Sequence, residues 1–294
     1  MCEKLGISRA AYYKWLNRPV QQYEEDNKTL AQLIIEYDER FGHILGYRRM
    51  ADWINYYNGT EHSRKRVRRT MRKLGIHAVI RRKRRTHTYT TPETVAENIL
   101  NRDFNASEPN EKWATDVTEF KVPNAIKQKL YLSAIIDLYD RSIVSYVVSC
   151  RNDNKLVFDT FYKAIAENPG SHAIFHSDRG FQYTGKYFKA QLEKQGMTQS
   201  MSRVGHCIDN GPTEGLWGII KTEMSATNEI TDEASLRAAI DKYIDFYNNV
   251  RIQERYGKKT PSQVRAEALQ TKDPNQYPIA ENKRIEKYKA KFVA

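Results

Sequence analysis

The chain has 294 residues, of which 40% are hydrophobic and 29% charged, a composition typical of globular domains that excludes disordered and membrane-like classes. No apolar run approaches the roughly 20 residues of a membrane-spanning helix, residues 1–6 lack the apolar stretch of a secretion signal, and three cysteines are too few for a disulfide framework, so we expect a cytoplasmic protein. Lysine and arginine outnumber aspartate and glutamate by 48 to 36, and twelve of the basic residues lie within residues 63–91, which contain no acid. This local excess predicts a surface that binds a polyanion.

Residues 1–24 contain a Gly-Ile-Ser turn at residues 6–8, with Ser8 as the expected N-cap of a short helix. The segment is typical of the end of a helix-turn-helix whose first helix is missing. An amphipathic N-terminal helix explains the same pattern, and both interpretations stay open at this point.

Residues 25–78 predict a small domain of three helices, over residues 25–40, 47–57 and 64–74. Each helix has apolar residues spaced to cover one face. The residues expected to face the core are Leu30, Leu33, Ile34, Tyr37, Met50, Trp53, Ile54, Tyr57, Val67, Met71 and Leu74.

The third of these helices is unusually basic. Ser63 is its expected N-cap and Gly75 its expected end. The basic residues that project away from its apolar face are Arg64, Lys65, Arg68, Arg69, Arg72 and Lys73. We interpret residues 64–74 as a helix that lies in a DNA groove; a solvated basic face is the alternative, which the absence of acids disfavours.

Residues 79–109 connect this domain to the rest of the chain and have no apolar period. They begin with a basic arm that is expected to follow phosphates or to enter a minor groove. The arm consists of Arg81, Arg82, Lys83, Arg84 and Arg85.

Residues 110–267 change character, with three apolar, β-branched and aromatic runs followed by alternating helices and strands. This order predicts one mixed five-stranded sheet with helices on its faces, in the α/β class. The expected strands are 113–120, 129–138, 142–150, 173–176 and 197–201, and the expected helices are 154–168, 184–195, 212–224 and 232–249. Residues 268–294 form a basic C-terminal tail.

Three acidic residues occupy unusual places in this region. Asp116 lies within an otherwise apolar and threonine-containing strand, Asp178 follows a strand at its carboxyl end, and Glu214 opens a helix after a polar loop. Carboxylates gathered on one sheet repel one another unless a cation neutralises them, and Mg²⁺ prefers such oxygen ligands. Taken singly, each acid is also explained as a hydrogen-bonded or helix-capping residue.

The short sequence motifs around these acids resemble those of a known protein family. Asp178 and Glu214 are separated by 35 residues, and the chain resembles the DDE transposases of the retroviral-integrase superfamily, in particular the second-frame (OrfB) product of insertion-sequence family 3. The matching stretches are residues 46–49, 64–67, 113–118, 176–183, 200–203, 209–214, 216–223, 247–251 and 260–261. Val204, His206 and Gly215 depart from the family pattern.

The resemblance implies a ribonuclease-H-like (retroviral integrase) catalytic core preceded by an all-α helix-turn-helix domain. It implies that Asp116, Asp178 and Glu214 hold two Mg²⁺ ions, for which Mn²⁺ can substitute, and catalyse strand cleavage and strand transfer. It also implies that Lys221 contacts the transposon end, although a solvent-facing lysine is the alternative there. The expected partners are double-stranded DNA, as terminal inverted repeats and as target, further copies of the chain, and an upstream-frame (OrfA) product.

Other conspicuous residues are expected to be structural. His176 is expected to be a packed histidine, and Asp137 and Asp140 to pair with Arg141. The aromatic residues expected in the core, rather than stacked on bases, are Trp53, Tyr56, Tyr57 and Trp217.

Two other functions remain open from the sequence. One is a DNA-binding regulator that kept the fold without activity, which the presence of all three acids disfavours. The other is a structure-selective nuclease or resolvase that cuts without joining, and it would use the same metal site.

Overall fold

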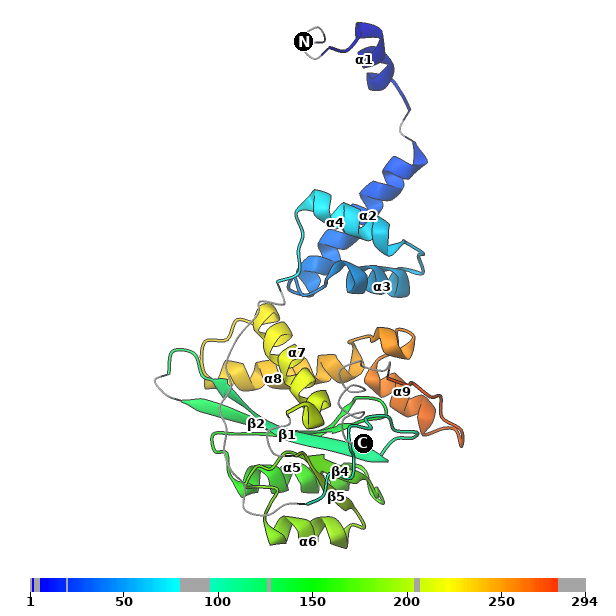
Figure 1. Ribbon diagram of the computed structural model, residues 1–294. Helices are drawn as coiled ribbons and strands as arrows, with labels where there is room; N and C mark the ends of the chain where they lie inside the picture. Colours follow the sequence, from blue (N-terminus) through cyan, green and yellow to red (C-terminus); the bar gives the residue numbers. More distant parts are fainter. Residues whose placement is uncertain are drawn as a thin grey trace, which may run out of the picture. The chain divides into compact units, whose positions relative to one another are not determined.

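The computed structural model describes residues 2, 6–19, 21–79, 96–125, 128–203 and 207–279. The chain separates into two compact units, Met1–Val79 and Ile80–Ala294 (Figure 1). Within the described ranges, no helix has the length and apolar character needed to cross a bilayer.

The described part of the first unit contains helices and no strand, as the sequence predicts. It contains α1 (Arg9–Leu16), α2 (Gln22–Arg40), α3 (Tyr47–Asn58) and α4 (Arg64–Leu74). Ser8 caps α1 by accepting a hydrogen bond from the Ala11 backbone N–H at 3.1 Å, which confirms that prediction. None of the residues of α1 is buried.

Helices α2, α3 and α4 share one core, and the ends of α4 are as predicted. The Ser63 side chain accepts a hydrogen bond from the Arg66 backbone N–H at 3.2 Å, and Gly75 ends the helix with a φ of 71°, a conformation that favours glycine. The predicted burial of Tyr57 and Leu74 is wrong, because their exposed fractions are 48% and 37%. Both residues lie in the last turn of their helices, where no following turn extends the apolar face over them.

The second unit contains the predicted mixed five-stranded sheet. Its strands are β1 (Lys112–Lys121), β2 (Lys129–Asp137), β3 (Ile143–Ser149), β4 (Ile174–Ser177) and β5 (Thr198–Met201). Their spatial order is β3-β2-β1-β4-β5. The first three strands are antiparallel, whereas β4 runs parallel to β1 and β5 parallel to β4. Strand β1 is therefore central, with β4 beside it.

Helices cover both faces of this sheet (Figure 1). Their bounds are α5 (Asn154–Glu167), α6 (Lys186–Lys194), α7 (Gly211–Thr227), α8 (Glu233–Asn249) and α9 (Pro261–Ala268). One core contains Ala114 and Phe120 of β1 together with apolar residues of α7 and α8. The other contains Trp113 of β1 with apolar residues of α5 and α6. The side chains of β1 thus alternate between the two layers, as a strand requires.

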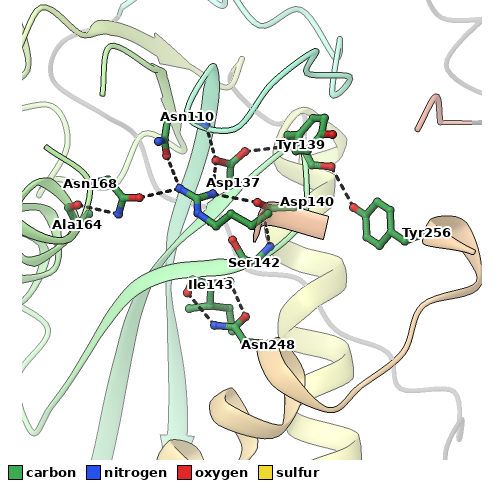
Figure 2. Close-up of polar contacts among 11 residues, drawn as sticks. Asn110, Asp137, Tyr139, Asp140, Ser142, Ile143, Ala164, Asn168, Asn248 and Tyr256 are labelled. Carbon is green, nitrogen blue, oxygen red and sulfur yellow. Dashed lines mark hydrogen bonds and ion pairs between the residues drawn. The ribbon is translucent and has the colours of Figure 1, made fainter. Parts of the chain in front are cut away.

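The helix α9 is tied to the sheet through Arg265, which joins a network of polar contacts that includes Asp137 and Asp140, both labelled in Figure 2. Its guanidinium donates to Asp137 and Asp140, each at 2.9 Å, and to the side-chain oxygens of Asn110 and Asn168. Burial and the charge of Asp140 raise the pKa of Asp137 to about 6, and Arg265 opposes this shift.

The predicted pairing of Asp137 and Asp140 with Arg141 is therefore wrong. Arg141 has a positive φ of 61° in the turn between β2 and β3, and its Nη2 donates to the Phe104 carbonyl at 3.4 Å. The two buried carboxylates are neutralised instead by a residue more than 120 positions further along the chain.

Candidate active site and nucleic-acid interface

Asp116 lies on the central strand and faces the layer formed by α7 and α8. It is half-buried, and each of its carboxylate oxygens accepts one hydrogen bond. Oδ1 accepts from the Val117 backbone N–H at 2.8 Å, and Oδ2 accepts from the Trp217 indole Nε1–H at 2.9 Å. The carboxylate is therefore oriented from two sides.

Asp178 follows β4 directly and lies beside Asp116. Strands β1 and β4 pair with Ala114 opposite His176, and the same register continued by two residues brings Asp116 level with Asp178. Asp178 Oδ1 accepts a hydrogen bond from the Gly180 backbone N–H at 2.8 Å. A Cβ atom at Gly180 would lie 3.0 Å from this same oxygen, so a side chain at this position would crowd the carboxylate.

The pKa values show that the acids influence one another. Burial, the charge of Asp178 and, as a smaller contribution, the charge of Glu214 raise the pKa of Asp116 to about 7, against the hydrogen bonds from Trp217 and Val117. Burial also raises the pKa of Asp178, and the Gly180 N–H opposes the change. Two half-buried carboxylates side by side resist full ionisation, and a bound cation would relieve this repulsion.

Glu214 lies in the first turn of α7, a helix that packs against β1. Asn210, Glu214, Trp217 and Lys221 are spaced by four, three and four residues, so they share one face of the helix. The Asn210 side chain donates to the Thr115 carbonyl at 3.2 Å, one residue before Asp116. The Glu214 side chain is exposed. Among the described residues, no three acidic, histidine or cysteine side chains approach closely enough to form a complete metal site.

The loop before α7 is anchored by Asp209, which the sequence does not single out. Its buried carboxylate accepts hydrogen bonds from Arg102, from the Arg203 side chain and backbone, and from Asn98. Burial alone would raise the pKa of Asp209, but the bonds from Arg203 and Arg102 lower it to about 2. Arg102 lies 107 residues from Asp209, so no local pattern indicates the pair.

His176 is a packed residue, as predicted. Its ring nitrogens lie 2.9 Å from the Ser200 hydroxyl and 3.2 Å from the Ser202 hydroxyl, and burial lowers its pKa to about 4. The expectation that tryptophans and tyrosines lie in the core holds for Trp53 and Trp217 but is wrong for Tyr56 and Tyr57, which are 43% and 48% exposed.

The predicted basic residues of α4 are all exposed, but they differ in their contacts. Arg64 forms an ion pair with Asp52 of α3, and the Arg68 guanidinium lies 5.3 Å from the centre of the Tyr47 ring. For the side chains of the other four, the described part of the chain supplies no hydrogen bond or ion pair. These four are Lys65, Arg69, Arg72 and Lys73.

The remaining residues that are predicted to bind DNA lie partly outside and partly within the described part of the chain. Arg81, Arg82, Lys83, Arg84 and Arg85 lie outside the described residues, as do Val204 and His206. Lys221 is exposed on α7, with its Nζ 5.3 Å from the centre of the Phe120 ring. Partial burial lowers the pKa of Lys221, and the charges of Glu119 and Asp116 oppose this shift.

Comparison with known proteins assigns the two units to families. Residues 106–207 and 214–269 match two models that are both described as "Integrase core domain", and residues 24–84 match an "HTH-like domain". Among solved structures, a simian T-cell lymphotropic virus intasome in complex with PP2A regulatory subunit B56 gamma aligns with a TM-score of 0.50 at 17% identity. That alignment covers 79% of this chain and 80% of the other, and it supports the fold: a ribonuclease-H-like core preceded by a helical domain.

Two curated relatives come from Escherichia coli (strain K12). A protein assigned as the transposase InsK for insertion sequence element IS150 is 36% identical over 264 residues, which cover 88% of this chain and 90% of the relative. The transposase InsF for insertion sequence IS3A is 29% identical over 268 residues, covering 90% of this chain and 92% of the relative. The chain therefore belongs to the transposases of insertion-sequence family 3, within the integrase superfamily.

Proposed function

We propose that this transposase binds the terminal inverted repeats of an insertion sequence and that Asp116, Asp178 and Glu214 form the site that cleaves and joins DNA strands. The observation that supports the site most strongly is the placement of Asp116 on β1 and of Asp178 directly after the adjacent parallel strand β4, with raised pKa values for both. On both sides of Glu214 the chain contacts β1, through Asn210 directly before helix α7 and through Trp217 within it.

The donor set fits a hard divalent cation. Asp116 and Asp178 offer carboxylate oxygens, the ligands that Mg²⁺ and Mn²⁺ prefer. Within the described ranges, no hydrogen bond reaches Oδ2 of Asp178, so that oxygen is available. When bound, two such ions lower the pKa of an attacking water and stabilise the leaving oxygen of a phosphodiester. We assign Asp116, Asp178 and Glu214 as the residues that would hold them.

The other residues orient these acids and the DNA. The Val117 and Gly180 backbone N–H groups fix one oxygen each of Asp116 and Asp178. Lys221, on the same face of α7 as Glu214, places a positive charge where the phosphates of a transposon end would lie. Because strand joining by a DNA 3′-hydroxyl needs no protein nucleophile, we assign no serine or tyrosine to a covalent intermediate.

The helix α4 supplies the DNA-binding surface of the first unit in this proposal. Lys65, Arg69, Arg72 and Lys73 are exposed and are not engaged by neighbouring described side chains, so their charges are available to phosphates or base edges. Arg64 and Arg68 flank this surface and also stabilise the contact with α3. We propose the basic arm Arg81–Arg85 as a further phosphate contact, and further copies of the chain and an upstream-frame (OrfA) product as partners.

A strand-transfer assay tests the proposal. Purified protein, alone and with the upstream-frame product, is incubated with labelled linear DNA that carries the element ends, in Mg²⁺, Mn²⁺ or EDTA. We expect metal-dependent nicking at the 3′ ends and joined products, both lost in Asp178→Asn, while end binding is retained. Cleavage without joined products would indicate a nuclease, and binding without cleavage under every condition would indicate a regulator.

A further inference from the structure

The single polar atom of the Trp217 side chain, the indole Nε1, forms a hydrogen bond with Asp116. Its side chain is 7% exposed and belongs to the core between the sheet and helices α7 and α8. From that apolar position the indole Nε1–H donates to Asp116 Oδ2 at 2.9 Å. The buried indole Nε1 of Trp113, three residues before Asp116, has no hydrogen-bond partner among the described residues. Burial of an indole in this fold therefore does not by itself provide its N–H with a hydrogen-bond acceptor.

The indole is the side chain that orients the Asp116 carboxylate. The terminal torsion of an aspartate is soft, so a carboxylate with one hydrogen bond can still rotate. The bond from the Val117 backbone holds Oδ1, and the bond from Trp217 holds Oδ2, which together fix the plane of the group. Each ionised oxygen has a second acceptor position, so both remain able to bind a cation.

The same helix carries Glu214 three residues before Trp217, on the same face. The indole bond therefore links α7, which carries Glu214, directly to the Asp116 carboxylate. Asn210, four residues before Glu214, provides a second bond to the strand at the Thr115 carbonyl. The helix is held to β1 on each side of Glu214.

We propose that Trp217 is a positioning residue, which orients the Asp116 carboxylate through its indole N–H and couples it to the helix that carries Glu214. This inference rests on the proposed site, because it assumes that Asp116 is a metal ligand. Hydrogen-bond partners of metal ligands typically contribute about 10- to 100-fold to metal affinity or activity. An indole that serves only for packing would contribute to stability and to nothing else.

The test compares two matched substitutions in the full chain. Trp217→Phe removes the N–H bonded to Asp116 and keeps most of the ring; Trp113→Phe makes the same change at another buried indole without touching a carboxylate. Mn²⁺ affinity is measured by isothermal titration calorimetry, with melting temperature and element-end Kd as controls. We expect Trp217→Phe to weaken Mn²⁺ binding by roughly 10-fold or more, and Trp113→Phe to leave it unchanged.

The remaining outcomes separate this inference from the proposed site. The unsubstituted chain should bind Mn²⁺, and Asp116→Asn should abolish that binding. If both hold but Trp217→Phe binds Mn²⁺ as tightly as the unsubstituted chain, the positioning role is overturned and the site stands. If Trp113→Phe loses affinity equally, packing explains the effect and the inference is again overturned. If the unsubstituted chain shows no Asp116-dependent binding, the proposed site fails and this inference fails with it.

Discussion

At Asp116, burial and the neighbouring Asp178 disfavour the ionised carboxylate, whereas a bound cation would favour it. The pKa of this group is about 7 in the fold against 3.8 for an unperturbed aspartate. The folded state therefore binds the proton more tightly than the unfolded chain does. The resulting contribution to stability is complete below about pH 4 and is lost as the pH rises to about 7, unless a cation replaces the proton.

Asp116→Asn should consequently stabilise the metal-free protein at alkaline pH. Asparagine keeps an oxygen for the bond from Trp217 or Val117 and cannot ionise, so the repulsion from Asp178 disappears. In EDTA at about pH 8, we expect a gain of about 1 kcal/mol, because water screens a half-buried group, and the gain should vanish towards about pH 4. Thermal unfolding across this pH range measures it. A stability difference between variant and parent that does not change across this pH range would contradict the account, because only the ionisation of Asp116 makes the difference depend on pH.

At the scale of single elements, the basic residues of α4 fall into two groups, those that contact α3 and those that do not. Arg64 and Arg68 contact α3, whereas Lys65, Arg69, Arg72 and Lys73 project without described partners. The outward set is the part of α4 that we expect to bind DNA, and the two flanking arginines have a structural role as well.

Replacing Lys65, Arg69 and Arg72 together by Ala should weaken binding to element ends and flatten its salt dependence. Removing one contact with a phosphate reduces the slope of log affinity against log salt by about 0.9. A matched control replaces Lys186, Lys189 and Lys194 of α6, which gives the same charge change on exposed residues elsewhere. Fluorescence anisotropy at several salt concentrations compares the two. Equal slopes for both triple variants would show that α4 is a solvated face.

Local patterns predict most elements but none of the long-range pairs. Helix caps such as Ser63 and Ser8, and the alternation of β1, depend on a few neighbouring residues, so the sequence shows them directly. The contacts of Trp217 with Asp116 and of Arg102 with Asp209 join residues 101 and 107 positions apart. Only the packing of the whole chain brings such residues together, and this also explains why the predicted pairing of Asp137 with Arg141 is wrong.

For the second unit as a whole, Arg265 connects α9 to the end of the sheet through its bonds to Asp137 and Asp140. Asp137 and Asp140 have no solvent-exposed surface, and Arg265 is the cation that neutralises both. The helix α9 is therefore an integral part of the folded second unit.

Arg265→Met should destabilise this unit by about 3–5 kcal/mol, because it leaves two buried carboxylates without their cation. Adding Asp140→Asn should recover part of the loss, since Asn can still accept the bond that Asp140 receives from the Ser142 N–H. Urea denaturation of the full chain, followed by circular dichroism, measures both variants. A loss below about 1 kcal/mol for Arg265→Met, or no recovery in the double variant, would contradict this account of α9.

The central claim is that Asp116, Asp178 and Glu214 hold the catalytic metal ions, and anomalous diffraction from crystals grown with Mn²⁺ and element-end DNA tests it most directly. The account predicts anomalous peaks in contact with the carboxylates of Asp116 and Asp178, with Glu214 completing the site, and their loss in Asp116→Asn crystals. Manganese bound elsewhere, or an unchanged peak in the variant, would contradict the claim.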